Sequence, residues 1–138
     1  KELVHPDLLK QLSENVLWII FDERLLRCAD KIRDLYGACT VNTSSLDGCG
    51  LVPFSYARDA KFSPHKFGRA LDVHIVSIEK EAAKISDPDQ RKKFKIKEYT
   101  KVRERLMLLG DFNVLNFENG VGWLHCDTYS RPNRLFNP

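Results

Sequence analysis

A helical repeat of apolar residues between Asp22 and Gly37 constrains the fold of this chain most strongly. Asp22 is a typical N-cap residue, and Gly37 is a typical residue at the end of a helix. Between them, apolar side chains recur at the spacing of one helix face: Leu25, Leu26, Ala29, Ile32, Leu35 and Tyr36. The spacing predicts a helix over 22–36 whose apolar stripe must be buried against another element.

Other predicted helices and strands precede and follow this helix in the sequence. Pro6 begins a predicted helix over 6–14, and one apolar stripe that stops at Gly110 predicts another over 95–109. Alternating or β-branched runs predict strands over 39–42, 70–76, 113–116 and 123–128, with a turn at Asn119-Gly120. No repeat or linker divides the chain, so we expect one domain over 1–138. Its class is α+β, with helices packed on a small, mainly antiparallel sheet.

The segment 43–67 follows neither the helical nor the strand period. It contains Gly48, Gly50, Pro53 and Pro64, which favour turns and irregular backbone. A loop of this length is uncommon inside a small domain unless it lines a binding site. We therefore expect it to border a cleft.

Composition excludes several function classes. No apolar run approaches the roughly 20 residues that a membrane helix needs, so we expect no membrane span. The net charge of +3, from 22 basic and 19 acidic residues, is too small for a nucleic-acid-binding signature. The basic stretch Arg91–Arg105 is interrupted by Glu98 and Glu104, which is typical of a solvated helix face. The four cysteines form no CxxC pair, and their redox state and pairing stay open.

Three of the four histidines lie in or beside predicted strands, close to aspartates. These are His65, His74 and His125. A catalytic zinc site uses three nitrogen, sulfur or oxygen ligands and leaves a fourth position for water. Because alternate residues of a strand share a face, Ala70, Asp72 and His74 point one way, and Leu71, Val73 and Ile75 point to the core. The same parity places Trp123, His125 and Asp127 together on the cleft side, with Leu124 and Cys126 behind them.

Two motifs carry a family resemblance. The string SPHKFGRALD, residues 63–72, resembles the SxHxxGxAxD motif of zinc D-alanyl-D-alanine carboxypeptidases and L-alanyl-D-glutamate endopeptidases, which cleave peptidoglycan peptides. The string GWLHCDT, residues 122–128, resembles the second motif of that family, W/F-x-H-x-D-T. The family shares its fold with the hedgehog signalling domain. The resemblance implies that zinc is bound by His65, Asp72 and His125.

Other site residues are assigned with more alternatives. Many family members carry an acid or a histidine two or three residues before the last zinc ligand, but Gly122 and Trp123 stand there in this chain. The hedgehog-like relatives carry a glutamate several residues before that last ligand, a histidine, and this resemblance implies Glu118 as the general base. Asp127 is the alternative for this role or a residue that orients a ligand imidazole. Expected substrate contacts come from Ser63, His74, Trp123 and Arg58. Arg58 takes the place of an arginine that the family carries before its first motif.

The sequence thus predicts a zinc metallopeptidase that hydrolyses peptide bonds in peptidoglycan stem peptides. We expect a monomer with no nucleic-acid partner, in an extracytoplasmic or phage-associated location. One alternative is a non-catalytic zinc-containing module of the same fold that has lost its base. A nucleic-acid enzyme is the other alternative, suggested only by the pI of about 8.7 and the basic helix.

Overall fold

Helix α3 (Glu23–Tyr36) forms where the apolar repeat predicts it and packs against the interior strand β2 (Ala70–Ile75). Asp22 caps the helix by accepting a hydrogen bond from the Arg24 amide, and Gly37 ends it with a φ of 80°. These relationships come from a computed structural model that describes residues 4–41, 50–53, 55 and 62–137. The predicted helix over 22–36 is therefore confirmed.

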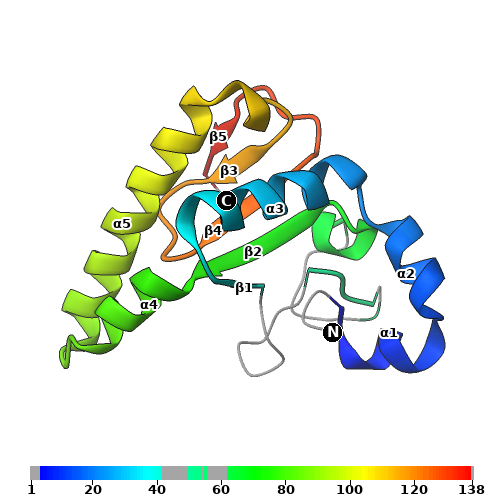
Figure 1. Ribbon diagram of the computed structural model, residues 1–138, viewed down its shortest axis with the longest axis horizontal. Helices are drawn as coiled ribbons and strands as arrows, with labels where there is room; N and C mark the ends of the chain where they lie inside the picture. The colour runs from blue at the N-terminus through cyan, green and yellow to red at the C-terminus, as the bar shows by residue number, and fades with distance from the viewer. Residues whose placement is uncertain (1–3, 42–49, 54, 56–61, 138) are drawn as a thin grey trace.

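The sheet has five strands in the order β1-β2-β4-β3-β5 (Figure 1). Their bounds are Cys39–Val41 for β1, Asn116–Glu118 for β3, Leu124–Asp127 for β4 and Leu135–Phe136 for β5. All neighbouring pairs are antiparallel except β3 with β5, which is parallel. The α+β class and the mainly antiparallel sheet are thus confirmed.

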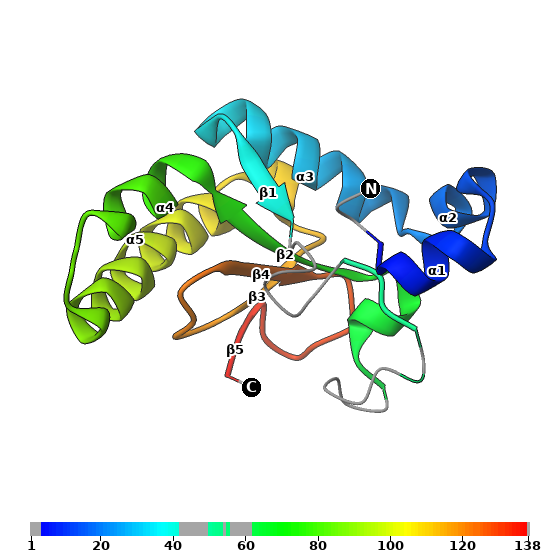
Figure 2. The same ribbon diagram turned by 90° about the horizontal axis from the view of Figure 1, so that it is seen from below.

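One face of the sheet is covered by helices, and the other carries Asp72 and His125. Figure 2 shows α3, α4 (Val76–Ala83) and α5 (Pro88–Leu108) together on one side of the strands. The core on that side contains Leu71, Val73 and Ile75, as strand parity predicts. Leu124 and Cys126 of β4 are buried in the same cluster. Strand parity consequently places Asp72 of β2 and His125 of β4 on the other face of the sheet.

Helix α5 begins seven residues earlier than the predicted start at 95. Asp87 caps it by accepting hydrogen bonds from the Asp89 and Gln90 amides, and Pro88 occupies the first turn. That Asp-Pro pair is a recognised start signal for a helix. The unpredicted helix α4 starts directly at the end of β2, where Val76 leaves the strand, so the predicted strand 70–76 is one residue too long. No side chain caps α4, which left little signal for it in the sequence.

Two other segments differ from the predictions. The helix predicted over 6–14 ends at Gln11, and a second helix, α2 (Glu14–Ile20), follows after Ser13. The strand predicted over 113–116 is wrong, because the chain first makes a 3₁₀ turn, η3 (Gly110–Phe112), that buries Phe112. Strand β3 therefore starts only at Asn116 and continues to Glu118. The turn predicted at Asn119-Gly120 does connect β3 to β4, with Gly120 at a φ of 73°.

The predicted loop 43–67 lies largely outside the described residues. Its described part includes the bridge between Leu51 and Val4 and the 3₁₀ helix η2 (Pro64–Phe67). Cys28, Cys39 and Cys126 are free thiols, and Cys49 lies outside the described part. Among the helices that the structure describes, none has both the length and the apolar character that a bilayer crossing requires.

Candidate metal centre

The turn that carries His65 is built by the first motif. Ser63 precedes η2 and accepts a hydrogen bond from the His65 amide through its hydroxyl at 3.4 Å, and Pro64 occupies the first helical position. Gly68 ends η2 in the left-handed region, with a φ of 62°. A Cβ atom at Gly68 would lie 2.6 Å from the Ile20 carbonyl oxygen, so only glycine fits. The motif thus fixes the backbone immediately around His65.

The imidazole of His65 is oriented by a backbone carbonyl. Its Nδ1 lies 3.3 Å from the Gly50 carbonyl oxygen. A carbonyl oxygen only accepts, so Nδ1 carries the proton and donates, and Nε2 keeps its lone pair. That Nε2 atom lies 3.7 Å from Asp72 Oδ2. His65 therefore presents its free nitrogen to Asp72.

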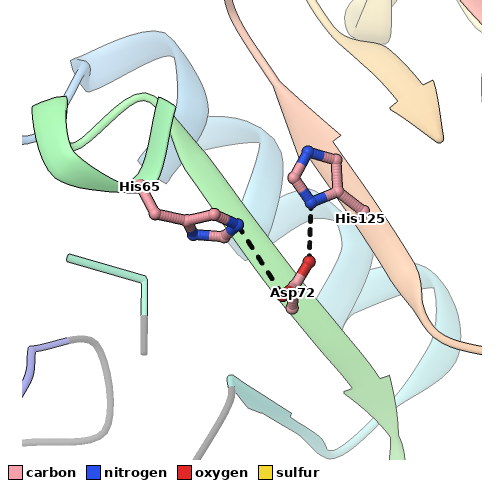
Figure 3. A group of neighbouring side chains, drawn as sticks. All are labelled: His65, Asp72 and His125. Carbon is pink, nitrogen blue, oxygen red and sulfur yellow. Dashed lines mark hydrogen bonds and ion pairs between the residues drawn. The ribbon is translucent and has the colours of Figure 1, made fainter. Parts of the chain in front are cut away.

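Asp72 and His125 meet across the sheet. They are register partners in the antiparallel pair of β2 and β4, and His125 Nδ1 lies 2.7 Å from Asp72 Oδ1 (Figure 3). The rings of His65 and His125 have centroids 5.1 Å apart, on either side of the carboxylate. The three predicted ligands are thereby brought together from η2, β2 and β4.

This group could hold a metal ion. One ligand atom from each of His65, Asp72 and His125 lies within 4.8 Å of the others. Zinc with nitrogen and oxygen ligands at about 2.0–2.1 Å in a tetrahedron requires ligand atoms about 3.3 Å apart. The separations of 2.7 and 3.7 Å from the Asp72 oxygens to the two imidazoles fall on either side of that value. A metal ion could therefore be held by this set of nitrogen and oxygen donors.

Asp127 lies on the side of His125 that faces away from Asp72. It is fully buried, and its Oδ2 is 3.5 Å from His125 Nε2. It also accepts hydrogen bonds from Asn116 at 2.9 Å, from the Tyr129 amide at 3.0 Å and from Arg131 at 2.6 Å. Burial alone would raise the pKa of Asp127, but the hydrogen bonds from His125, Arg131 and Asn116 outweigh it and lower the pKa to about 2. Its oxygens are thus committed to holding His125 with Nδ1 turned toward Asp72.

The charge of His125 reflects these neighbours. Burial opposes its positive charge, but the carboxylates of Asp127 and Asp72 outweigh burial and raise the pKa of His125 to about 9. The imidazole is therefore held strongly between two carboxylates. A metal ion at Nδ1 would take the place of a proton there.

Glu118, the predicted base, lies at the end of β3 and reaches the same group. Its Oε2 is 3.9 Å from His125 Nδ1, and its side chain is 16% exposed. Burial raises the pKa of Glu118, and the negative charge of Asp72 raises it further, whereas His125 and Arg103 act in the opposite direction. Burial of this carboxylate close to the three candidate ligands is the kind of environment in which general bases are found.

His65, Asp72 and His125 are called the metal group below, and His74 is not part of it. Its Nδ1 faces Glu79 Oε1 at 3.3 Å. Glu79 also accepts from the Tyr99 hydroxyl at 2.9 Å and pairs with Lys95 at 2.9 Å. Burial would raise the pKa of Glu79, but its hydrogen bonds with His74, Lys95 and Tyr99 lower it to about 2. Through Glu79, His74 is joined to α4 and α5.

The remaining predicted contacts have different placements. Ser63 is buried and caps η2, and Trp123 is partly exposed immediately before β4. Arg58 lies outside the described residues, so its predicted contact with substrate stays a prediction. Arg69 is exposed, and its guanidinium lies 5.9 Å from the centre of the Tyr129 ring.

Several residues that shape the site were not found from the sequence. Gly50 contributes only a carbonyl oxygen, and Glu79 belongs to a helix that was not predicted. Asn116 and Arg131 bind Asp127 from segments on either side of β4, and no motif links them. Thr128, the last residue of the second motif, donates a hydrogen bond to Asp22 at 2.8 Å. The threonine of the second motif was therefore the one sequence signal for this contact, which joins the end of β4 to the N-cap residue of α3.

Comparisons of the chain with protein-family models, with curated proteins and with solved structures return no match. The residues and their geometry therefore carry the functional argument.

Proposed function

We propose that this protein is a zinc-dependent peptidase that hydrolyses a peptide bond in peptidoglycan stem peptides. The observation that carries the proposal is the convergence of His65, Asp72 and His125, with one ligand atom from each residue within 4.8 Å of the others. The same residues occupy the ligand positions of the two motifs that resemble the zinc peptidoglycan peptidases. Geometry and resemblance thus support one donor set.

The protein's own residues supply orientation and proton transfer. When bound, zinc supplies Lewis-acid activation of a carbonyl group and of a water molecule. Gly50 holds the imidazole of His65, and Asp127 holds that of His125, so both rings present the correct nitrogen. Glu118 accepts a proton from the attacking water and delivers it to the leaving amine. The C–N bond breaks, water is consumed, and Glu118 returns to its starting state.

A second candidate is a zinc-containing module without turnover. One observation favours it: Gly122 and Trp123 occupy the positions where many members of the resembled family carry a proton-transfer residue. The location of Glu118 within 3.9 Å of His125 Nδ1 argues for turnover. The two candidates differ in what happens to a peptide substrate.

The test is mass spectrometry of the fragments that the zinc-loaded protein releases from purified peptidoglycan, with metal content measured on the same samples. We expect His65→Ala to lose both zinc and cleavage, because it removes a ligand. Glu118→Gln should keep zinc and lose cleavage, because an amide does not accept the proton. Glu81→Gln, an exposed glutamate of α4 paired with Lys84, is the matched control and should change neither.

Each outcome decides between the candidates. Cleavage by the native chain that is lost in Glu118→Gln supports the peptidase with Glu118 as base. Zinc binding without any released fragment supports the non-catalytic module. Normal cleavage by Glu118→Gln means that the assignment of the base is wrong.

A further inference from the structure

A groove lies between the start of α5 and the β3–β4 hairpin. Its volume is ≈ 480 Å³. Its apolar side chains are those of Trp123, Ile96, Pro88 and Val121, and its charged side chains are those of Arg91, Lys92 and Lys95. Among the described residues that line it, none is acidic. We call it the α5 groove.

The positive charge of the α5 groove is only partly neutralised. Lys95 pairs with Glu79 at 2.9 Å. Arg91 donates two hydrogen bonds to the Ile85 carbonyl oxygen, at 2.9 and 2.6 Å, and this neutral acceptor leaves its charge uncompensated. Lys92 is exposed. Two cations of the groove therefore remain available to an anionic ligand.

The α5 groove is linked to His65, Asp72 and His125 by the chain before β4 and by the interactions of Glu79. Trp123 lies two residues before His125, in the bend that precedes β4, so the Cα atoms of the two residues are at most about 7 Å apart. On the neighbouring strand, His74 lies two residues after Asp72 and shares Glu79 with Lys95. A peptide bound at the metal group would reach the groove within about two of its residues.

The wall formed by the hairpin is held firmly against α5. The guanidinium of Arg103 donates to the carbonyl oxygens of Val121 at 3.3 Å and Trp123 at 3.0 Å. A Cβ atom at Gly122 would lie 3.2 Å from Lys95 Cβ, so the hairpin backbone approaches the helix closely. Trp123 is thus presented at a fixed distance from the cations of α5.

We propose that the α5 groove binds a carboxylate-bearing segment of the peptide substrate. Trp123 and Ile96 contact the apolar part of that segment, and Lys92 and Arg91 bind its carboxylate. The carboxylate belongs either to an acidic side chain or to the carboxyl terminus of the peptide. This inference rests on the proposed peptidase function and assigns its substrate class: acidic peptides over neutral ones.

The test compares two adjacent lysines of α5. Lys92 lines the groove and the equally exposed Lys93 does not, so Lys92→Glu and Lys93→Glu make the same change of net charge on the same helix turn. Each is introduced into the zinc-loaded Glu118→Gln protein, which holds the peptide intact. Calorimetry then measures binding of L-Ala-D-Glu-L-Lys-D-Ala, of its D-Glu carboxamide and of its C-terminal amide.

We expect Lys92→Glu to weaken binding of the free tetrapeptide by about tenfold, and Lys93→Glu to change it by less than about twofold. One of the two amidated peptides should bind weakly and lose its sensitivity to Lys92→Glu, and its identity names the carboxylate. Trp123→Leu should weaken binding of all three peptides. Equal effects of the two lysine changes, or equal binding of all three peptides, would overturn the inference.

Failure of this inference is distinguishable from failure of the proposed function. If the native chain cleaves the tetrapeptide but Lys92 has no effect, the peptidase stands and the groove assignment is wrong. If nothing is cleaved but the Lys92 dependence is seen, the groove stands without turnover. Tighter binding of a single-stranded oligonucleotide than of the tetrapeptide, with the same Lys92 dependence, overturns the peptide assignment.

Discussion

Asp72 and His125 face each other from neighbouring antiparallel strands, with Asp72 Oδ1 2.7 Å from His125 Nδ1. The residues are 53 positions apart in the chain and are brought together only by the register of β2 with β4. A shift of that register by one residue would turn one of the two side chains into the core. The three candidate ligands therefore meet only when β2 and β4 pair in this register, and the two motifs alone do not bring them together.

Replacing Asp72 by Asn should reduce zinc affinity by about 100-fold or more. The change removes the anionic ligand, and loss of residues that only support a ligand already costs about 10- to 100-fold. Competition with a chromogenic chelator measures the affinity. Asp111→Asn, which removes an exposed aspartate paired with Lys31, is the control and should bind zinc as the native chain does. Unchanged affinity in Asp72→Asn would show that Asp72 is not a ligand.

Replacing Asp127 by Asn should weaken both zinc binding and the fold. The amide cannot accept from His125, Asn116 and Arg131 together, so zinc affinity should fall about tenfold or more, because His125 is no longer oriented. The free energy of unfolding without metal should fall by about 2–3 kcal/mol, because buried donors lose their partner. Urea denaturation and chelator competition measure the two effects.

Arg131→Gln is the comparison for Asp127→Asn. It removes the ion pair at 2.6 Å but leaves the Asp127 carboxylate beside His125 Nε2. We expect a loss of stability with a smaller loss of zinc affinity than in Asp127→Asn. If the two variants lose zinc affinity equally, Asp127 acts through general stability rather than through the orientation of His125.

Replacing Gly68 by Ala should be far more damaging than replacing Gly120 by Ala. Both glycines have positive φ, 62° and 73°, so both changes incur the left-handed penalty of about 1 kcal/mol. Only at Gly68 would the new Cβ lie 2.6 Å from a backbone oxygen, that of Ile20, whereas nothing lies within 4 Å at Gly120. We expect a loss above about 2 kcal/mol at Gly68 and about 1 kcal/mol at Gly120. Thermal unfolding of the two metal-free variants tests this difference.

The stability that Asp22 contributes should depend on pH in the acid range. Its hydrogen bond with Arg24 is the main cause that lowers its pKa from 3.8 to about 2, against the effect of burial. Because the folded-state pKa is the lower one, the stabilisation is present above pH 3.8 and is lost as the pH falls through about 2. With screening by solvent, its size is on the order of 1–2 kcal/mol.

Asp22→Asn isolates this effect, because asparagine also caps helices well. The native chain should be more stable than the variant at pH 6, and the difference should shrink steadily toward pH 2. Urea denaturation of the metal-free proteins at several pH values measures it. A difference that stays constant over this range would show that the charge of Asp22 does not contribute.

Local signals accounted for the parts of the fold that local chemistry decides. The apolar stripe between Asp22 and Gly37 is sufficient to predict α3, because helix periodicity and both caps lie within one segment. Helix α4 and the true position of β3 were missed for the opposite reason. Val76 starts a helix without a capping side chain, and Asn113 lies in a turn whose form depends on the burial of Phe112.

Some residues of the candidate site could be found from the sequence, and others only from the tertiary structure. The sequence named His65, Asp72 and His125 through the two motifs that resemble the zinc peptidoglycan peptidases, and it named Glu118 because hedgehog-like relatives also carry a glutamate several residues before the last histidine. It could not find Gly50 or Glu79, because their roles depend on which distant segments pack beside them. Strand register and helix packing decided those neighbours, and these long-range contacts follow from burial of the whole core rather than from any single segment.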